Sequence, residues 1–239
     1  MKIFIISLKR SVDRRERIKK QLDGMGIEFK FIDAVDALTP DFTNSELRNE
    51  QLTRKRFGYK LLDSEVACFS SHKLAWEQCI LSNKPILILE DNCGLTDAFF
   101  HYFNTLSLLS KKYNFLKLCA TKPKAYKTIE RINTDLSVIR YFRRTCGTMG
   151  YIISPQAACL FIKQANIFIE PVDDYMEKPY KHGVITYCIS PDLVARAKIE
   201  STIGSSRKDK TGVTIANKIY IECFRLYEQI RDFLVKPPY

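Results

Sequence analysis

Short apolar runs and helical spacings alternate along the start of the chain. Residues 2–8 form a strongly apolar run, which predicts a buried strand. After it, Ile18, Leu22 and Met25 recur at the i, i+4 and i+7 positions of an amphipathic helix. Residues 28–33 then return to a strand pattern. Because crossover connections are right-handed, we expect these two strands to be parallel neighbours.

The rest of the chain continues this alternation. Ser64 is predicted to cap a helix over residues 65–81, and residues 36–62 before it are predicted to form one irregular helix and a loop. The lysine-rich residues 121–133 are predicted to form an exposed, mobile loop. Further strands are predicted at 85–89, 114–120, 136–142, 151–154 and 186–190, and further helices at 96–110, 155–165 and 213–234. The pattern predicts an α/β fold with a mostly parallel central sheet flanked by helices.

One predicted strand ends in a group of polar residues. Pro85 precedes four consecutive aliphatic residues, and the strand runs directly into Glu90, Asp91 and Asn92. Because side chains alternate along a strand, Glu90 and Asn92 are predicted to project to one side and Asp91 to the other. At the carboxyl edge of a parallel sheet, oxygen ligands two residues apart can hold a hard divalent cation. Alternatively, these residues only end a strand and begin a turn at Gly94.

Composition and charge limit the class of protein. A chain of 239 residues can hold one large domain or two small ones, and 46% hydrophobic content is enough to bury a core; we interpret the chain as one domain with appendages. Its 38 basic and 27 acidic residues give a net charge of +11, which favours polyanionic partners such as nucleotide phosphates or anionic lipid headgroups. None of the familiar nucleic-acid-binding patterns occurs, so nucleic acid is not expected as a partner. No stretch is long enough to span a bilayer.

Cysteine usage suggests the cellular compartment. The eight cysteines occur singly, without a Cys-x-x-Cys pair, and mostly in apolar contexts such as that of Cys119. This pattern indicates reduced, buried thiols and neither disulfides nor a zinc site. The apolar run at residues 3–8 is too short for a signal peptide. We therefore expect a cytoplasmic protein.

Arginines gather where the first strand ends and its helix begins. Arg10, Arg14 and Arg15 stand at this junction, where helix-terminal amides and guanidinium groups together can bind a diphosphate. Residues 9–20 contain seven basic and two acidic residues, so a solvated basic face is the competing interpretation. For Arg14 and Arg15 as individual ligands, the charge pattern favours the solvated face.

Three further positions each have a functional and a structural interpretation. His72 lies within a predicted helix beside its apolar face, where a histidine is more often structural than a ligand. The backbone at Gly147 can either approach a ligand or make a bend. Asp173 and Asp174 repel each other if partly buried, so one can have a raised pKa suited to proton abstraction. Alternatively, the pair simply lies at the favourable amino end of a helix.

The chain ends in a predicted amphipathic helix. Its apolar face consists of Ile215, Ile219, Cys223, Leu226 and Ile230, and Lys218, Arg225 and Arg231 lie elsewhere on the helix. This face either packs on the domain or binds a membrane surface or a partner. Residues 201–239, a mobile basic segment and this helix, are therefore set apart from the domain at residues 1–200.

Taken together, several separated motifs resemble glycosyltransferase family 25, the lipooligosaccharide galactosyltransferases of bacteria and their animal relatives that galactosylate collagen hydroxylysine. The motifs, in chain order, are residues 3–15, 33–36, 64–72 and 88–92, Gly147-Thr148 with Tyr151, and residues 171–173. They span nearly the whole chain. Several motifs in the right order are more specific than any one of them.

The resemblance implies a GT-A-like catalytic domain over residues 1–200. Such a domain takes a hexose from a UDP-sugar, here UDP-galactose, and transfers it with inversion to a glycolipid or oligosaccharide acceptor. The implied Mn²⁺ or Mg²⁺ contacts are Glu90, Asp91 and Asn92. The implied donor contacts are Ser7, Arg10, Arg14, Asp91, Gly147 and Thr148, and the implied catalytic residues are His72, Asp173 and Asp174. Asp173 is the first choice for the base that deprotonates the acceptor hydroxyl, and Asp174 is the second.

One residue departs from the family pattern Leu-Glu-Asp-Asp. Asn92 stands in place of the second aspartate, and its amide oxygen can coordinate a cation but brings no charge, so metal affinity should fall. The leading hypothesis is a metal-assisted transferase at the cytoplasmic face of a bacterial inner membrane. The alternative is a catalytically weakened or non-catalytic relative that binds a nucleotide sugar or a glycan. A basic nucleic-acid-binding protein ranks last.

Overall fold

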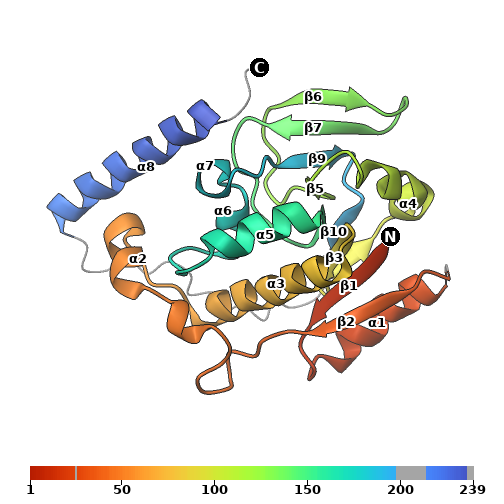
Figure 1. Ribbon diagram of the computed structural model, residues 1–239, viewed down its shortest axis with the longest axis horizontal. Coiled ribbons are helices and arrows are strands. Elements are labelled where there is room, and N and C mark those ends of the chain that lie inside the picture. The colour runs from red at the N-terminus through yellow and green to blue at the C-terminus, as the bar shows by residue number, and fades with distance from the viewer. Residues whose placement is uncertain (25, 198–213, 236–239) are drawn as a thin grey trace.

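The structure is a computed structural model that describes residues 1–24, 26–197 and 214–235. In this part of the chain, eight strands form a central sheet in the order β2-β1-β3-β8-β5-β9-β7-β6, with helices packed around it (Figure 1). The strands are β1 (Lys2–Ser7), β2 (Phe29–Asp33), β3 (Ile86–Glu90), β5 (Phe115–Lys117), β6 (Tyr126–Arg131), β7 (Ser137–Tyr141), β8 (Gly150–Ile153) and β9 (Tyr187–Ser190). A small second sheet pairs β4 (Cys93–Leu95) with β10 (Val194–Arg196).

The central sheet is mixed, which corrects the predicted mostly parallel sheet. The strand β1 runs parallel to both β2 and β3, as the sequence predicts for β1 and β2. The strand β8, however, runs antiparallel to its neighbours β3 and β5. A strand buried on both faces has the same apolar composition in either direction, so composition could not reveal this reversal. The predicted α/β class is confirmed.

Helices cover both faces of the sheet. The helices are α1 (Val12–Asp23), α2 (Glu50–Phe57), α3 (Asp63–Ser82), α4 (Asp97–Leu109), α5 (Pro155–Gln164), α6 (Val172–Met176), α7 (Pro179–His182) and α8 (Ile215–Val235), with a short 3-10 turn η1 (Ser45–Leu47). Alternation along β3 divides the core: Ile86 and Ile88 pack with side chains of α3 and α5, and Leu87 and Leu89 pack with those of α1 and α4. Glu90 therefore follows the side of α3, and Asp91 the side of α1.

Several predicted elements have different limits in the structure. Helix α3 begins at Asp63, with Leu62 and not Ser64 at its N-cap, and the Glu65 carboxylate accepts a 3.1 Å hydrogen bond from the Leu62 amide. The predicted loop at 121–133 contains β6, which pairs antiparallel with β7. Five of its six side chains are exposed and three are charged, as suits an edge strand, and this hid its strand character. Of the predicted helical positions, Met25 lies outside the described residues.

The cysteines only partly match their prediction. All eight lie within the described residues and none forms a disulfide. Four are buried as expected, at positions 79, 93, 119 and 188. Cys159 and Cys223 are exposed, which corrects the expectation of buried thiols at these positions.

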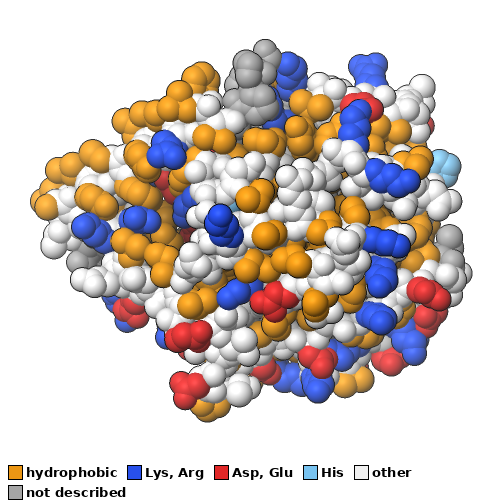
Figure 2. Space-filling model, viewed as in Figure 1, with side chains coloured by type: hydrophobic (Ala, Val, Ile, Leu, Met, Phe, Trp, Pro, Cys, Tyr) orange, Lys and Arg blue, Asp and Glu red, His pale blue; other side chains and the backbone are white. Residues whose placement is uncertain are grey.

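Helix α8 packs on the domain with the face opposite to its predicted apolar stripe. Ile221 and Glu228 are buried against the domain, and the Phe224 ring lies 5.7 Å from that of Phe57 in α2. Figure 2 shows hydrophobic side chains in a row along the outer surface of this helix, at the upper left. The predicted mobile segment at 201–210 lies outside the described residues. In the part of the chain that is described, no helix has the length and apolarity needed to cross a membrane.

Candidate functional site

Two adjoining clefts open where β1 and β3 end. The larger has a volume of about 540 Å³ and is lined by Gly147, Thr148 and Asp173 among others. The smaller has a volume of about 210 Å³. Its lining includes Ser7, Arg10, Arg14, His72 and Asp91. Cys68, Glu90 and Asn92 line both. Of the residues predicted for the site, all line one of these clefts except Arg15 and Asp174.

The Glu90 carboxylate accepts hydrogen bonds from three side chains. Asn92 donates from Nδ2 to Oε2 over 2.8 Å, and His72 Nε2 lies 3.2 Å from Oε1. The Thr148 hydroxyl also donates to Oε1. Burial by itself would raise the pKa of Glu90, but these hydrogen bonds and the nearby His72 together hold the pKa below its ordinary value. The carboxylate is therefore charged at neutral pH although it is enclosed.

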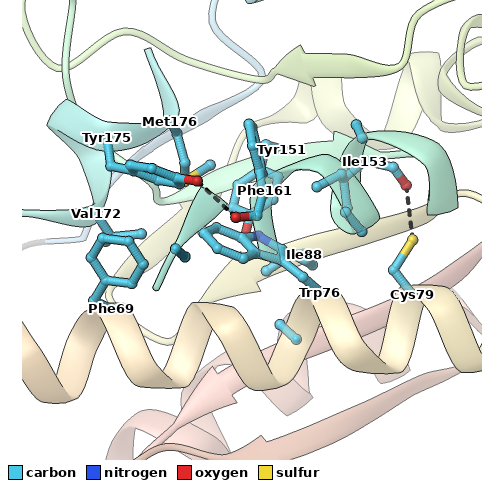
Figure 3. Close-up of a cluster of buried hydrophobic side chains, with 14 of the residues drawn as sticks. Phe69, Trp76, Cys79, Ile88, Tyr151, Ile153, Phe161, Val172, Tyr175 and Met176 are labelled. Atoms are coloured by element: carbon cyan, nitrogen blue, oxygen red, sulfur yellow. Dashed lines mark hydrogen bonds between the residues drawn. The ribbon is translucent and has the colours of Figure 1, made fainter. Parts of the chain in front are cut away.

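His72 is oriented by a buried relay of ring side chains. Trp76 Nε1 donates to the Tyr151 hydroxyl oxygen over 3.0 Å, and that oxygen lies 2.8 Å from Nδ1 of His72. Because an indole N–H only donates, the Tyr151 proton is available for Nδ1, an assignment that leaves the His72 Nε2 proton for Glu90. Figure 3 shows Trp76 and Tyr151 in the packed core. His72 is fully buried, so this geometry makes it a positioning residue for Glu90.

The amide oxygen of Asn92 indicates that a cation could fit beside Glu90. Its Oδ1 is buried and accepts no hydrogen bond from the described residues, while its Nδ2 is held by Glu90. A buried amide oxygen without a partner costs free energy, and it is a suitable ligand for a hard divalent cation. Glu90 and Asn92 also line the same clefts, as their predicted common side requires. These two residues therefore fit one side of a cation site.

Asp91 lies on the other side of the strand end, as alternation predicts. Ser7 donates to its Oδ2 over 2.7 Å, and Arg14 Nη1 lies 3.3 Å from its Oδ1. Arg17 in α1 donates to the backbone oxygens of Asp91 and Cys93. Both carboxylate oxygens thus have protein partners and the charge is matched by Arg14, so a role for Asp91 as a metal ligand stays a prediction.

The arginines of α1 have defined partners. The side chains of Arg14 and Arg15 are only 17% and 20% exposed, so the solvated-face interpretation is wrong for these two residues. Arg15 donates to the Ser7 carbonyl over 2.7 Å and to Asp33 over 2.6 Å. Arg10 is half exposed and pairs with Asp36 at the rim of the smaller cleft. The basic segment therefore ties together the ends of β1, β2 and β3.

Cys68 was not singled out by the sequence analysis as a site residue. Its sulfur lies within 4.8 Å of ligand atoms of both His72 and Glu90, a set of S, N and O donors that suits Zn²⁺ better than Mn²⁺ or Mg²⁺. The available signal was the i, i+4 spacing of Cys68 and His72, which places them on one helix face. Asp192 and Arg196 also line the larger cleft and were not predicted.

The two aspartates of α6 have different surroundings. Asp173 lines the larger cleft and accepts a 3.2 Å hydrogen bond from the Gly147 amide. Asp174 faces a separate pocket beneath α8, and its Oδ1 lies 3.9 Å from Nη1 of Arg144. Burial, reinforced by the charge of Asp173, raises the pKa of Asp174. The expected raised pKa thus occurs in the aspartate outside the cleft.

The segment at Gly147 has a backbone that only glycine fits. Its φ is +84°, and a Cβ atom there would lie 2.0 Å from the Thr121 hydroxyl oxygen. The next residue, Thr148, donates to Glu90. Two consecutive residues therefore hold Asp173 and Glu90 in one cleft, and the close approach of Gly147 is to Thr121.

Comparison with known proteins gives consistent matches. The family described as "Glycosyltransferase family 25 (LPS biosynthesis protein)" matches residues 1–176. The lipooligosaccharide biosynthesis protein lic2B of Haemophilus influenzae is 29% identical over 178 residues, which is 70% of this chain and 62% of that protein. The lacto-N-neotetraose biosynthesis glycosyltransferase LgtE of Neisseria gonorrhoeae is 28% identical, over 81% of this chain and 73% of that protein. Human procollagen galactosyltransferase 2 is 27% identical over 77% of this chain, which spans 31% of the human protein.

Proposed function

The chain belongs to glycosyltransferase family 25, and on this premise we propose that it is an inverting hexosyltransferase that uses a UDP-sugar. The family implies a nucleotide-sugar donor and a glycan acceptor. Galactose as the sugar is suggested by the name of the procollagen relative, and a lipooligosaccharide acceptor by the name of the Haemophilus relative. The matched region, residues 1–176, contains all the predicted site residues, which supports a GT-A-like catalytic domain within residues 1–200.

One observation carries the proposal. The Gly147 amide binds Asp173 and the adjacent Thr148 hydroxyl binds Glu90, so a candidate base and a candidate cation ligand share one cleft. An inverting transferase needs these two functions on opposite sides of the reacting carbon. The cleft volume of about 540 Å³ is within the range of small-molecule sites.

The smaller cleft suits the nucleotide part of the donor. Ser7, Arg10 and Arg14 line it, next to Glu90 and Asn92. Guanidinium groups bind phosphate oxygens in bidentate geometry, and Arg10 is the more exposed of the two arginines. We place the diphosphate along this side, with the sugar directed into the larger cleft.

Glu90 and the Oδ1 of Asn92 are the proposed ligands of Mn²⁺ or Mg²⁺. Such a cation supplies positive charge that offsets the charge developing on the departing diphosphate. His72 and Thr148 keep the Glu90 carboxylate charged and oriented for this role. Asp91 stays in the proposed ligand set, and Glu90 and Asp91 would each have to offer the cation a carboxylate oxygen that now accepts a hydrogen bond from the protein.

Asp173 is the proposed catalytic base. It accepts the proton of the acceptor hydroxyl while that oxygen bonds to the anomeric carbon from the face opposite the diphosphate. The bond from the anomeric carbon to the phosphate oxygen breaks in the same displacement, so the configuration inverts. Asp174 remains the second choice, although it faces away from the cleft.

A second candidate is a catalytically weakened member that binds the donor without turning it over. It is favoured by a specific observation: the Asn92 amide donates a hydrogen bond to one carboxylate oxygen of Glu90, and Asn92 itself contributes no negative charge to a cation site. In this case the chain would bind a nucleotide sugar in the same clefts.

Hydrolysis of a panel of UDP-sugars with and without Mn²⁺ or Mg²⁺ tests the proposal. The expected result is release of UDP from one sugar donor, dependent on the cation, with UDP-galactose the first to test. Donor binding without any hydrolysis or transfer would favour the second candidate. No binding and no hydrolysis for any donor would contradict both. We place the reaction at the cytoplasmic face of a bacterial inner membrane.

A further inference from the structure

Helix α8 turns its apolar side chains to solvent. Between 51% and 78% of each of six large residues on this helix is exposed: Ile215, Ile219, Leu226, Ile230, Phe233 and Leu234. Their spacing places them on one stripe along the helix. A helix on the surface of a globular domain ordinarily packs such a stripe against the core. Among the described residues, the stripe therefore does not pack on the domain.

The opposite face of α8 fixes the helix in this orientation. Glu228 is 4% exposed and accepts hydrogen bonds from Lys178 and from the Tyr180 hydroxyl, the latter over 2.6 Å. Arg144 Nη2 lies 3.5 Å from the same carboxylate. Rolling the helix to bury its stripe would separate the buried Glu228 carboxylate from Lys178, Tyr180 and Arg144, and breaking a buried ion pair in this way is costly. The outward stripe is thus a consequence of a buried ion cluster.

We propose that the outward face of α8 docks on an anionic lipid surface. By their spacing, Lys218 and Arg225 border one side of the stripe, and Arg231 lies beyond the other side. The exposed Glu222 also lies at the first border, where it accepts a 2.8 Å hydrogen bond from Arg225, so basic residues outnumber acidic ones along the stripe by three to one. All three basic side chains are exposed. An apolar stripe flanked by cations is typical of helices that lie in the plane of a membrane interface. The exposed rings of Tyr220 and Tyr227 also border the stripe, and tyrosine is favoured at headgroup depth.

Charge favours lipid over a second copy of the chain. In a symmetric dimer through this stripe, Lys218, Arg225 and Arg231 of the two copies would come together with only Glu222 of each copy to offset them, in a chain that already carries +11. An anionic membrane attracts both borders at once. The inference of lipid docking does not depend on the proposed chemistry of transfer. It rests on the proposed function in one respect, namely that a lipid-anchored acceptor would be presented at the same membrane surface.

The anchoring cluster also connects α8 to the candidate site. Arg144 contacts Glu228 of α8 and lies 3.9 Å from Asp174 in α6. Asp174 is adjacent in sequence to Asp173, the proposed base, which lines the larger cleft. A membrane bound to α8 would therefore lie at a fixed position relative to Asp173 and the larger cleft, where the acceptor is proposed to bind.

Cosedimentation with vesicles tests the docking. The full chain is mixed with vesicles of phosphatidylcholine, or of an equal mixture of phosphatidylcholine and phosphatidylglycerol. The test variant is Leu226→Ser with Ile230→Ser. The matched control is Leu81→Ser with Leu108→Ser, because these leucines of α3 and α4 are 78% and 67% exposed and lie away from α8. Circular dichroism and the thermal midpoint establish that both variants are folded.

The expected result is binding to the mixed vesicles that the α8 variant weakens by roughly tenfold or more and the control leaves unchanged. Three results would overturn the inference: no binding to mixed vesicles, equal weakening by the control, or a wild-type dimer that the α8 variant dissociates. UDP release is measured on the same proteins without vesicles. If the wild type releases UDP but does not bind the mixed vesicles, only the inference of lipid docking is refuted. If it binds the vesicles but does not release UDP, only the proposed reaction is refuted.

Discussion

Asn92 Nδ2 lies 2.8 Å from Oε2 of Glu90, and this contact holds together the two side chains that face both clefts. In Asn92→Asp, two carboxylates would stand where an amide and a carboxylate now hydrogen-bond. Without a cation they repel, and with one they share its charge. We expect affinity for Mn²⁺ to rise roughly tenfold or more in calorimetric titrations, and the metal-free variant to unfold at a lower temperature. The exposed Asn166→Asp is the control, and an unchanged Mn²⁺ affinity would argue against Asn92 as a ligand.

Asp173 and Asp174 should differ sharply when each is changed to asparagine. Asp173→Asn removes the proposed base but keeps an oxygen for the Gly147 amide. We expect kcat for transfer to fall by about 10²–10⁴-fold while the Kd for UDP changes little. Asp174→Asn, outside the cleft, should retain most of the turnover. If only Asp174→Asn abolished transfer, the second choice for the base would be the right one.

Gly147→Ala has a matched control in Gly183→Ala, because both glycines have positive φ. At Gly183 nothing lies within 4 Å of an added Cβ, so the cost should be the left-handed backbone alone, about 1–2 kcal/mol. At Gly147 the Cβ also clashes with Thr121, which should add roughly 1–3 kcal/mol. Denaturant unfolding measures both, and transfer should fall only in Gly147→Ala. Equal losses of stability would show that the contact with Thr121 is unimportant.

His182 should make stability depend on pH. Its Nδ1 accepts from the Val184 amide and its Nε2 contacts the Tyr175 carbonyl, and burial lowers its pKa to about 4. Between that value and the ordinary 6.5, the unfolded chain binds a proton that the folded chain does not. Stability should therefore be lost as pH falls through this window, by roughly 3 kcal/mol in total, and be unaffected by this group above it.

Unfolding free energies of His182→Gln, measured across the same range of pH, check this. The variant should be less stable at neutral pH, because the buried contacts are altered, but its stability should decline less on acidification. The exposed His101→Gln is the control and should keep the wild-type slope. An unchanged slope in His182→Gln would place the acid sensitivity elsewhere.

The sequence predicted the part of the site that depends on strand alternation. The apolar run of β3 ends at Leu89, so the end of the strand could be predicted from the sequence. The opposite directions of Glu90 and Asp91 followed from the alternation of side chains along a strand. The partners of these residues did not follow. Tyr151 is distant in sequence from His72, and their 2.8 Å contact depends on the antiparallel pairing of β8 with β3. Composition does not encode that pairing direction.

Tertiary contacts that the sequence does not reveal also explain the wrong prediction for Arg14 and Arg15 and the undecided orientation of the last helix. Arg14 and Arg15 look like a solvated run until the strand ends bring Asp91 and Asp33 beside them. The stripe of α8 was visible in the spacing, but which face packs on the domain depends on Glu228 meeting Lys178. Periodicity gives the face of a helix, and tertiary ion pairs decide where that face points.

Calorimetric titration of UDP into the wild type and Glu90→Gln, with and without Mn²⁺, tests the central claim most directly. UDP is common to every candidate donor, so the result does not depend on the sugar. The account predicts saturable binding that Mn²⁺ strengthens roughly tenfold or more, with that enhancement lost in Glu90→Gln. Absence of UDP binding to the wild type under both conditions, or an enhancement that survives in Glu90→Gln, would contradict it.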